Sequence, residues 1–450
     1  MSELKIPQGY KKTEIGVIPE DWELAQLSNL CERISVGLAT SVTKYYRNKG
    51  VPIVRNMNIK DGYFDSEDML YLDSGFAKKN ISKAARAFDV ITVHTGSNIG
   101  LTCVLPENFD YCQTFTTLIT TTNKKRLNPF YLSFHMGSES GKKEILRLQV
   151  GGGKGNLNTG ELKQYLLSYP KKLTEQTAIA TALSDVDALI CELEKLIAKK
   201  QAIKTATMQQ LLTGKTRLPQ FALREDGTIK GYKQCELGAI PEDWDVKTYG
   251  EVFTFLSTST NSRDDLSSDG DLGYIHYGDI HTKWNNRLDL DRQNLPKISR
   301  NLVSSALILD GDLIMADASE DYQGIGKSVE IFNIRNKKIV AGLHTFLLRD
   351  KNKILADGFR GYLHAISTVK AAFDRLATGL KVYGISKNNL TTIFLPVPSI
   401  EEQTAIAKIL ADMDSEIQAL EQRLVKTRQI KQGMMQELLT GKTRLVQPEA

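Results

Sequence analysis

The eight residues LLTGKTRL occur twice, at 211–218 and at 438–445, and their Gly-Lys-Thr triplet has the composition of the end of a phosphate-binding loop. Such a loop needs another glycine five residues earlier, after a strand, so that backbone amides can surround the phosphates. Gln209 and Gln436 occupy that place, and both follow a helical pattern. A glycine just after the last apolar residues is typical of a left-handed helix end. We therefore predict that Gly214 and Gly441 terminate helices and bind no nucleotide.

Other residues with potential chemistry lack the spacing of a known site. The run GIGKS at 324–328 has Asp321 in place of the first glycine of a phosphate loop, and TGSNIG at 95–100 lacks a G-x-G start. His276, Asp279 and His281 are close in sequence but do not follow a recognised metal-ligand spacing. Paired carboxylates and a nucleophile elbow are also missing from the sequence. We predict no catalytic residue, no metal and no cofactor for this chain, and free thiols for its five cysteines, which form no C-x-x-C pair: Cys31, Cys103, Cys112, Cys191 and Cys235.

The sequence contains an internal repeat. GYKKTEIGVIPEDW at 9–22 returns as GYKQCELGAIPEDW at 231–244, and the segment that opens with EQTAIA at 175 returns at 402. Residues 175–218 and 402–445 align without gaps and share 25 of 44 positions. The stretches between these ends share only a faint skeleton: PIVRNMNI (52–59) resembles GYIHYGDI (273–280), and DVITVHTG (89–96) resembles DLIMADAS (312–319). The repeated ends therefore flank two central stretches that differ in sequence, as expected of two modules that share a scaffold and recognise different targets.

Each repeated segment is predicted to be a long helix. Apolar residues recur in alternating steps of four and three, the seam of a coiled coil. About 38 residues at 1.5 Å each give a rod of roughly 57 Å, which needs a partner for its apolar stripe. We expect the two copies to be that partner for each other, in antiparallel orientation. The seam consists of Ile179, Leu183, Val186, Ile190, Leu193 and Ile197 in the first copy, and of Ile406, Leu410, Met413, Ile417, Leu420 and Leu424 in the second.

The central stretches read as mixed α and β modules, because short β-branched or aromatic runs such as FDVITVHTG alternate with glycine and asparagine turns. Arg, Lys, Asn and Gln on loops can contact base edges, and aromatic and hydroxyl groups can contact sugar and phosphate. Such residues also occur on any solvated loop. The candidates for DNA contact are Lys44, Tyr45, Tyr46, Arg47, Arg55, Asn56, Asn58, Lys154, Asn156 and Asn158 in the first module, and Asn261, Arg263, His276, Tyr277, His281, Lys283, Asn285, Asn286, Arg287, Lys381 and Tyr383 in the second.

Bulk composition fits a soluble protein of at least two domains. The chain has 450 residues, 41% hydrophobic and 25% charged, with a formal net charge of +5. This charge is compatible with nucleic acid but does not require it. No signal peptide and no apolar run long enough for a bilayer is present, so we expect a cytoplasmic protein.

The combined pattern resembles one known family. The lead LPVPSIEEQTAIAKIL into a long helix, the ending MQELLTGKTRL and the opening GAIPEDW, all duplicated, closely resemble the specificity subunit of type I restriction-modification enzymes. The resemblance covers nearly the whole chain, although the first copy has a different lead, LLSYPKKLTEQTAIA.

The resemblance implies an α+β fold, in which two globular mixed α/β target-recognition domains are separated by two long antiparallel coiled-coil helices in a pseudo-two-fold repeat. It implies a non-catalytic subunit in which each recognition domain reads one half of a bipartite, asymmetric double-stranded DNA site. The helices would set the spacer and dock two methyltransferase subunits, and restriction/translocase subunits would join them. S-adenosylmethionine, ATP and Mg²⁺ would belong to these partner subunits.

Two readings remain as rivals: an enzyme in its own right, and a coiled-coil adaptor that joins proteins without DNA. The expected domains are a first recognition domain at 1–174, helix 1 at 175–215, a linker at 216–230, a second recognition domain at 231–401 and helix 2 at 402–445.

Overall fold

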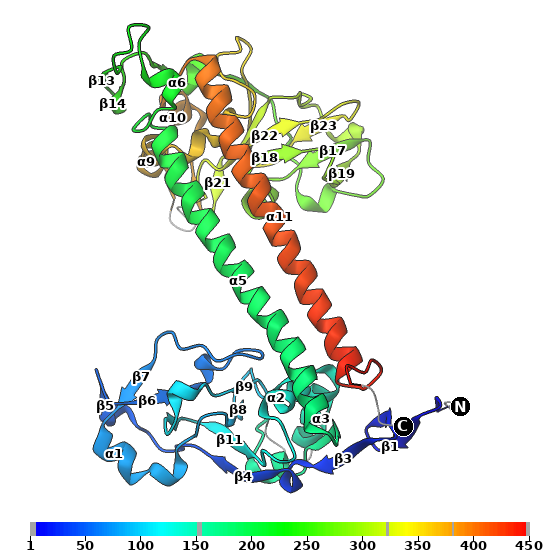
Figure 1. Ribbon diagram of the computed structural model, residues 1–450. Helices are drawn as coiled ribbons and strands as arrows, with labels where there is room; N and C mark the ends of the chain where they lie inside the picture. Colours follow the sequence, from blue (N-terminus) through cyan, green and yellow to red (C-terminus); the bar gives the residue numbers. More distant parts are fainter. Residues whose placement is uncertain (1–5, 151–154, 321–323, 380–381, 447–450) are drawn as a thin grey trace. The chain divides into compact units, whose positions relative to one another are not determined.

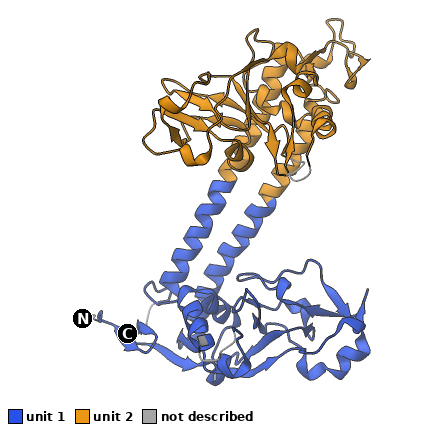
Figure 2. Cartoon of the chain, turned by 180° about the vertical axis from the view of Figure 1, so that it is seen from behind, with its two compact units in different colours: residues 1–195, 421–450 blue, residues 196–420 orange. Residues whose placement is uncertain are grey.

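The structure is a computed structural model that describes residues 6–150, 155–320, 324–379 and 382–446 (Figure 1). The chain divides into two units, residues 1–195 with 421–450 and residues 196–420 (Figure 2). Each unit holds one mixed α and β module together with one end of both long helices. The predicted fold class, two such modules with two long helices and an internal repeat, is confirmed.

The first module contains two four-stranded sheets and two separate strand pairs. In one sheet the order is β4-β11-β8-β9, all antiparallel, and in the other it is β10-β6-β7-β5, with β10 and β6 parallel. The strand pairs are β1 with β2 and β3 with β12. The strands are β1 (Tyr10–Thr13), β2 (Gly16–Pro19), β3 (Trp22–Gln26), β4 (Cys31–Val36), β5 (Tyr46–Arg47), β6 (Val51–Val54), β7 (Leu70–Leu72), β8 (Val90–Val93), β9 (Thr102–Val104), β10 (Gln113–Thr114), β11 (Thr117–Thr122) and β12 (Leu166–Pro170). The helices are α1 (Ser74–Lys79), α2 (Pro129–Gly137), α3 (Glu139–Val150) and α4 (Thr159–Lys163).

The second module repeats this plan with local changes. Its main sheet has the order β16-β24-β20-β22-β18, its second sheet the order β19-β17-β23, and β17 and β23 are parallel as β6 and β10 are. The pairs β13 with β14 and β15 with β26 match the two pairs of the first module, and β21 pairs with β25. The strands are β13 (Tyr232–Cys235), β14 (Gly238–Pro241), β15 (Asp245–Thr248), β16 (Thr254–Leu256), β17 (Leu272–Ile275), β18 (Asn286–Asp289), β19 (Lys297–Ile298), β20 (Leu313–Ala316), β21 (Ala318–Ser319), β22 (Ser328–Phe332), β23 (Ile339–Ala341), β24 (Thr345–Arg349), β25 (Tyr383–Gly384) and β26 (Phe394–Val397). The helices are α6 (Pro219–Ala222), α7 (Tyr249–Val252), α8 (Tyr277–Thr282), α9 (Ser367–Leu376) and α10 (Lys387–Thr391).

The faint sequence skeleton marks equivalent places in the two modules. DVITVHTG contains β8 and DLIMADAS contains β20, the strands that lie inside their main sheets and are almost wholly buried. Side chains that are buried on both faces of a sheet are mostly apolar or β-branched, which accounts for the similarity of these two runs. PIVRNMNI contains β6 and GYIHYGDI contains β17, each the parallel partner in its second sheet.

The long helices are α5 (Leu173–Leu211) and α11 (Ile400–Leu438), of 39 residues each. In the first unit, Lys431 pairs with Asp187 and Arg428 pairs with Glu194, at 2.6 and 2.5 Å. In the second unit, Lys200 pairs with Glu416 at 2.6 Å, and Lys204 pairs with Asp414. Residue numbers rise along one helix as they fall along the other, so the helices run antiparallel within each unit.

The predicted seam lies inward. Ile179, Leu183, Leu193, Ile197, Ile406, Leu410 and Ile417 are buried, and Val186, Ile190, Met413, Leu420 and Leu424 are half-buried. The core of the first module includes Ile179 and Leu183 from the start of α5 and Leu438 from the end of α11. Ile406, Leu410 and Leu211 enter the core of the second module in the same way. The helix ends are therefore part of each module's core.

The two repeated motifs meet at the helix ends. Gly214 and Gly441 have φ of +68° and +72°, so both glycines end their helices in the left-handed region, as predicted. A Cβ on Gly441 would lie 2.4 Å from Pro19, and one on Gly214 would lie 2.5 Å from Pro241. The LLTGKTRL motif therefore packs directly on the IPEDW motif in each unit, which explains why both are repeated.

An arginine closes each of these junctions, which we call the clasps. In the first unit, Arg444 donates to both oxygens of Glu175 at 2.6 and 2.8 Å and to Asp21 at 2.9 and 2.7 Å, and its guanidinium lies 5.9 Å from the Trp22 ring centroid. These carboxylates raise the pKa of Arg444. In the second unit, Arg217 binds Glu402 and Asp243 in the same way, 5.8 Å from the Trp244 ring centroid. Burial opposes ionisation of Asp243, but hydrogen bonds from Arg217 and Lys230 hold its pKa at about 2.

In the part of the chain that the structure describes, we find no helix with the length and apolar character that a bilayer crossing requires.

Candidate nucleic-acid interface

Several of the predicted DNA-contact residues gather where strand β8 ends in the first module. Thr95, just beyond β8, accepts a hydrogen bond from Asn56 Nδ2 through its carbonyl at 3.4 Å, and the carbonyl of His94 accepts from the amide of Leu157 at 3.0 Å. Asn158 caps α4 by accepting from the Glu161 amide at 3.0 Å. The structure thus brings two separate sequence stretches, 55–58 and 155–158, to one strand end. We call this the first loop cluster.

The buried side chain of Asn58 stabilises the first loop cluster through hydrogen bonds to the backbone. It is 1% exposed, its Oδ1 accepts from the Arg55 amide at 3.0 Å, and its Nδ2 donates to the carbonyls of Asp65 and Glu67 at 3.1 and 3.2 Å. Arg55 donates through Nη2 to the carbonyl of Asp68 at 2.6 Å. A buried amide that satisfies backbone groups fixes the loop but offers no surface to DNA, whereas Asn56 is half-buried and Asn156 and Asn158 are exposed.

The second loop cluster lies at the equivalent end of β20. Here the carbonyl of Asp317 accepts from the Ile385 amide at 2.9 Å, and the carbonyl of Ala318 bonds to His281 Nε2 at 2.9 Å. Leu157 and Ile385 directly precede the capping residues of α4 and α10, so the same backbone connection occurs in both modules. The second loop cluster comprises residues 259–265, 276–283, 317–319 and 383–385.

Aromatic and imidazole rings line part of the second loop cluster. Tyr277 lies with its ring centroid 4.5 Å from His276, 5.4 Å from His344 and 6.2 Å from His281. His344 also pairs with Asp317 at 3.3 Å. Burial lowers the pKa of His276, with nearby Arg263 acting in the same direction. Tyr383, half-buried in β25, joins the cluster through the pairing with β21.

Arg263 and Lys283 converge on a single carboxylate. Asp279 Oδ1 accepts from Arg263 Nη2 at 3.0 Å and pairs with Lys283 Nζ at 3.0 Å. Asn261, on the same loop as Arg263, donates through Nδ2 to Asp265 at 3.0 Å. These contacts bring together TNSR (260–263) and the start of HYGDIHTKWNNR (276–287), which are separated in sequence.

Other residues predicted to contact DNA make local contacts within the first module instead. Tyr45 stacks on Phe76 with ring centroids 3.8 Å apart, Lys44 lies 5.1 Å from the Tyr45 ring, and Arg47 donates to the carbonyls of Lys44 and Tyr46. Tyr46 belongs to β5 and packs on a small apolar cluster with Tyr45.

In the second module, Asn286 is buried at the start of β18 with φ of +57°, and Asn285 beside it is exposed. Arg287 lies with its guanidinium 3.9 Å from the Phe332 ring centroid. Lys154 and Lys381 lie outside the described residues. No observation here tests the DNA contacts, which stay predictions for all these positions.

Sequence reasoning considered Asp279 only for a metal site, which it rejected, and assigned no role to the clasp arginines. Asp279 gave no signal because Arg263 comes from another loop, and burial of an aspartate cannot be read from its neighbours in sequence. The clasp arginines did have a sequence signal, because Arg217 and Arg444 lie inside a motif that is repeated without change. In the described part of the chain, we find no group of three or more His, Cys, Asp or Glu side chains placed to hold a metal ion.

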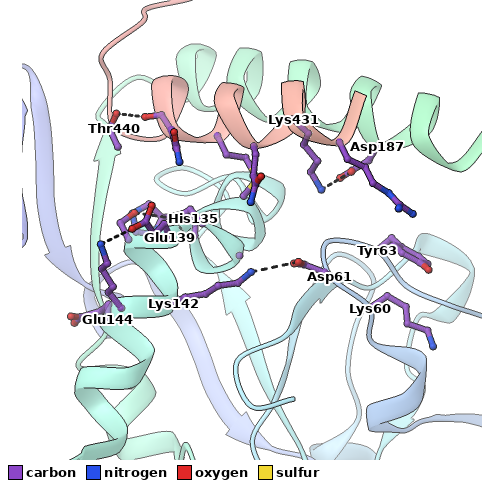
Figure 3. A pocket seen from close by; sticks show the side chains of 18 of the residues that line it. Lys60, Asp61, Tyr63, His135, Glu139, Lys142, Glu144, Asp187, Lys431 and Thr440 are labelled. Carbon is purple, nitrogen blue, oxygen red and sulfur yellow. Dashed lines mark hydrogen bonds and ion pairs between the residues drawn. The ribbon is translucent and has the colours of Figure 1, made fainter. Parts of the chain in front are cut away.

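The first unit also contains a groove of about 1670 Å³ between α2–α3, the loop at 60–64 and the paired segments 187–194 of α5 and 428–436 of α11 (Figure 3). Charges of both signs line it, with Lys142 3.5 Å from Asp61 and Lys431 2.6 Å from Asp187. Burial raises the pKa of Asp187, against the effect of Lys431. A groove with balanced charge suits a protein surface better than a phosphate backbone.

Comparison with known proteins agrees with this architecture. Residues 19–205 and 241–428 each match the family model described as the type I restriction modification DNA specificity domain. A Methanocaldococcus jannaschii protein named as the type I restriction enzyme MjaX specificity subunit is 27% identical over 454 residues, covering 97% of each chain. The MjaVIII specificity subunit of the same organism is 24% identical, covering 95% of this chain and 94% of its own.

Two solved structures share the fold. The S subunit of the type I restriction-modification system from M. genitalium aligns with a TM-score of 0.55 at 14% identity, over 97% of this chain and 98% of that one. A chain from a structure of type I R-M complex assembly and conformational transition aligns with a TM-score of 0.53 at 16% identity, over 95% and 99%. Two domain matches that together span most of the sequence settle the family: the chain belongs to the type I restriction-modification DNA specificity subunits, and carries two target-recognition domains.

Proposed function

We propose that this chain selects the DNA sequence for a type I restriction-modification complex and carries out no catalysis itself. Each module reads one half of a bipartite, asymmetric site in double-stranded DNA. The observation that carries the proposal is the pair of loop clusters: they sit at equivalent strand ends of a repeated scaffold but present different side chains. Two readers on one scaffold are what an asymmetric site requires, because each half-site needs its own set of base contacts.

The long helices support a role as spacer and as docking surface. A helix of 39 residues extends over about 58 Å, more than one turn of B-DNA, about 34 Å. The two helical repeats carry 13 basic and 11 acidic residues, a balance that favours protein partners over phosphates. We assign two methyltransferase subunits to this surface and to the mixed-charge groove beside it, with restriction/translocase subunits joining them. S-adenosylmethionine, ATP and Mg²⁺ would be bound by those partners.

The direct test is to assemble the chain with the methyltransferase subunits of its own host and to map methylated adenines in genomic DNA. We expect a two-part sequence with a fixed gap, methylated only when this chain is present. The chain alone, incubated with DNA and S-adenosylmethionine, should transfer no methyl group. If methylation did not depend on this chain, the rival adaptor role would be favoured, and turnover by the chain alone would establish it as an enzyme.

The spacer role has its own test. Inserting or deleting one heptad, about two helical turns, between Glu175 and Thr213, with the matching change in the second helix so that the seam is kept, should change the gap between half-sites while both half-site sequences persist. The gap is read from the same methylation map. A folded variant with an unchanged gap would show that the helices do not set it.

A further inference from the structure

We propose that Asp279 is a positioning residue that presents Arg263 for recognition of a guanine in the half-site read by the second module. The inference rests on the proposed function and adds to it one residue pair and one base. It is carried by the geometry of the pair, by the rigidity of its loop and by a comparison of the two modules.

A buried carboxylate here contacts two exposed cationic side chains. The side chain of Asp279 is 1% exposed, whereas those of Arg263 and Lys283 are 52% and 56% exposed. The carboxylate is therefore shielded from solvent, and it fixes the position of each cationic group by one contact. Arg263 uses Nη2 for this contact, and a guanidinium has five N–H donors, so most of its fork remains available.

The loop that carries Arg263 is fixed to the core of its own module. Tyr274 in β17 is fully buried; its hydroxyl donates to the carbonyl of Asn261 at 2.5 Å and accepts from the Leu343 amide at 2.9 Å. Ser262 caps the following turn by accepting from the Asp264 amide at 3.3 Å. A side chain held at both its backbone and its tip loses little entropy on binding, which favours selective contact.

The first module lacks this device at the equivalent position. Aligning PIVRNMNI with GYIHYGDI places Asn58 opposite Asp279, and both side chains are 1% exposed. Asn58 is neutral and spends its amide on backbone groups of residues 55, 65 and 67. The two modules thus have different side chains, an amide and a carboxylate, at one buried position within their loop clusters, as expected if that position helps them to read different bases.

Asp279 differs from a pair of buried carboxylates that the two modules share. Asp89 binds Arg33 at 2.8 Å, and Asp312, at the matching place, binds Arg349 at 2.6 Å. Asp312 engages both of its oxygens with Arg349. Oδ2 of Asp279, by contrast, is buried without a hydrogen-bond partner among the described residues. An unsatisfied buried oxygen costs stability and is typical of a functional site.

Guanine is the base that this arrangement fits. An arginine fork donates to guanine O6 and N7 together, and a guanidinium fixed by a carboxylate keeps the in-plane orientation that both contacts need. Lys283 has a single ammonium group and suits a phosphate, which carries no sequence information. Asp279 therefore supports one specific and one nonspecific contact.

The test uses three variants of the full chain in the assembled methyltransferase complex. Arg263→Lys keeps the charge but removes the fork, Asp279→Asn keeps the size, and Lys283→Gln removes the second cation. We expect Arg263→Lys to reduce methylation of the wild-type site roughly 10- to 100-fold and to relax the preference at one G·C pair of one half-site. Asp279→Asn should relax the same pair, and Lys283→Gln should weaken all sequences equally and flatten the salt dependence.

Controls separate this inference from its alternatives. Arg292→Lys, at an exposed arginine 3.7 Å from Asp289 in the same unit, should leave both sequence preference and rate unchanged. Adding Asp279→Asn to Arg263→Lys should change the preference little further, because Asp279 acts through Arg263. If Asp279→Asn does not fold, Arg263→Lys alone decides, since its side chain is exposed. The inference is overturned if the wild-type complex has a defined site and the Arg263→Lys complex keeps the full preference for it. It is also overturned if Arg263→Lys and Asp279→Asn relax the preference at different base pairs. A wild-type complex without any sequence preference would instead refute the proposed function.

Discussion

Arg444 and Arg428 are both paired with glutamates in the first unit, yet their surroundings give them different roles. The clasp residue Arg444 faces Glu175, which is 3% exposed, whereas Arg428 faces Glu194, which is 43% exposed. Removing one partner of a buried pair leaves an uncompensated charge out of water. An exposed pair is replaced by hydration at little cost.

Arg444→Ala should therefore lower the free energy of unfolding by about 3 kcal/mol, and the matched control Arg428→Ala by less than about 1 kcal/mol. Urea titrations of both variants and the wild type measure the difference. Equal losses in the two variants would show that the clasp adds no more than a surface ion pair.

His135 gives the first unit a pH-dependent stability. It is fully buried, with Nδ1 2.9 Å from the Tyr165 hydroxyl, and burial lowers its pKa to about 4, with Glu144 opposing the shift. In the unfolded chain the imidazole has its ordinary pKa near 6.5. Between these two values the unfolded state binds more protons, so stability is fully present above pH 6.5 and is lost as the pH falls toward 4.

His135→Gln should flatten this dependence, because glutamine keeps hydrogen-bonding groups but does not titrate. The slope of unfolding free energy against pH between 6.5 and 4 should fall by up to about 1.4 kcal/mol per pH unit. Chemical unfolding at several pH values measures it. A variant with the wild-type slope would mean that His135 is not kept neutral in the fold.

At the scale of the elements, the helix ends depend on two glycines that differ in role. Gly441 has φ of +72° and faces Pro19, so any Cβ is both strained and blocked, whereas Gly433 lies inside α11 with nothing within 4 Å of a Cβ position. Glycine inside a helix costs about 0.5–1 kcal/mol relative to alanine. The same substitution should therefore act in opposite directions at the two sites.

Gly441→Ala should lower the melting temperature, and Gly433→Ala should raise it by the equivalent of about 0.5–1 kcal/mol. Thermal unfolding followed by circular dichroism of the two variants decides the matter. Destabilisation by both would mean that Gly433 is needed in the helix for another reason.

The elements also show how far the sequence could be read. Helix α5 was predicted at residues 175–215 and runs from Leu173 to Leu211; the agreement is close because a period of three and four residues is local information. The strand in FDVITVHTG, β8, was recognisable from a local run of β-branched residues. Asn286 was chosen as a loop residue but is buried in β18, and Tyr45 stacks on Phe76; such outcomes depend on chain segments far apart in sequence, which no local pattern reports.

At the scale of the whole molecule, the repeat separates scaffold from recognition. Features present in both copies hold the fold: the clasps, the left-handed glycines and the buried aspartates Asp89 and Asp312 with their arginines. Asp279 with Arg263 is present in one copy only, and this pair lies in the second loop cluster. A duplicated chain thus contains its own comparison, and the differences between its halves indicate where specificity resides.

Exchange of one module is the most direct test of this account. Residues 25–165 would be replaced by the corresponding module of another family member, leaving both long helices and both clasps in place, and the methylated sequence of the assembled complex would be mapped. We predict that one half of the recognised sequence changes while the other half and the gap stay the same. A change in both halves, or in neither, would contradict the central claim that each module reads its own half-site.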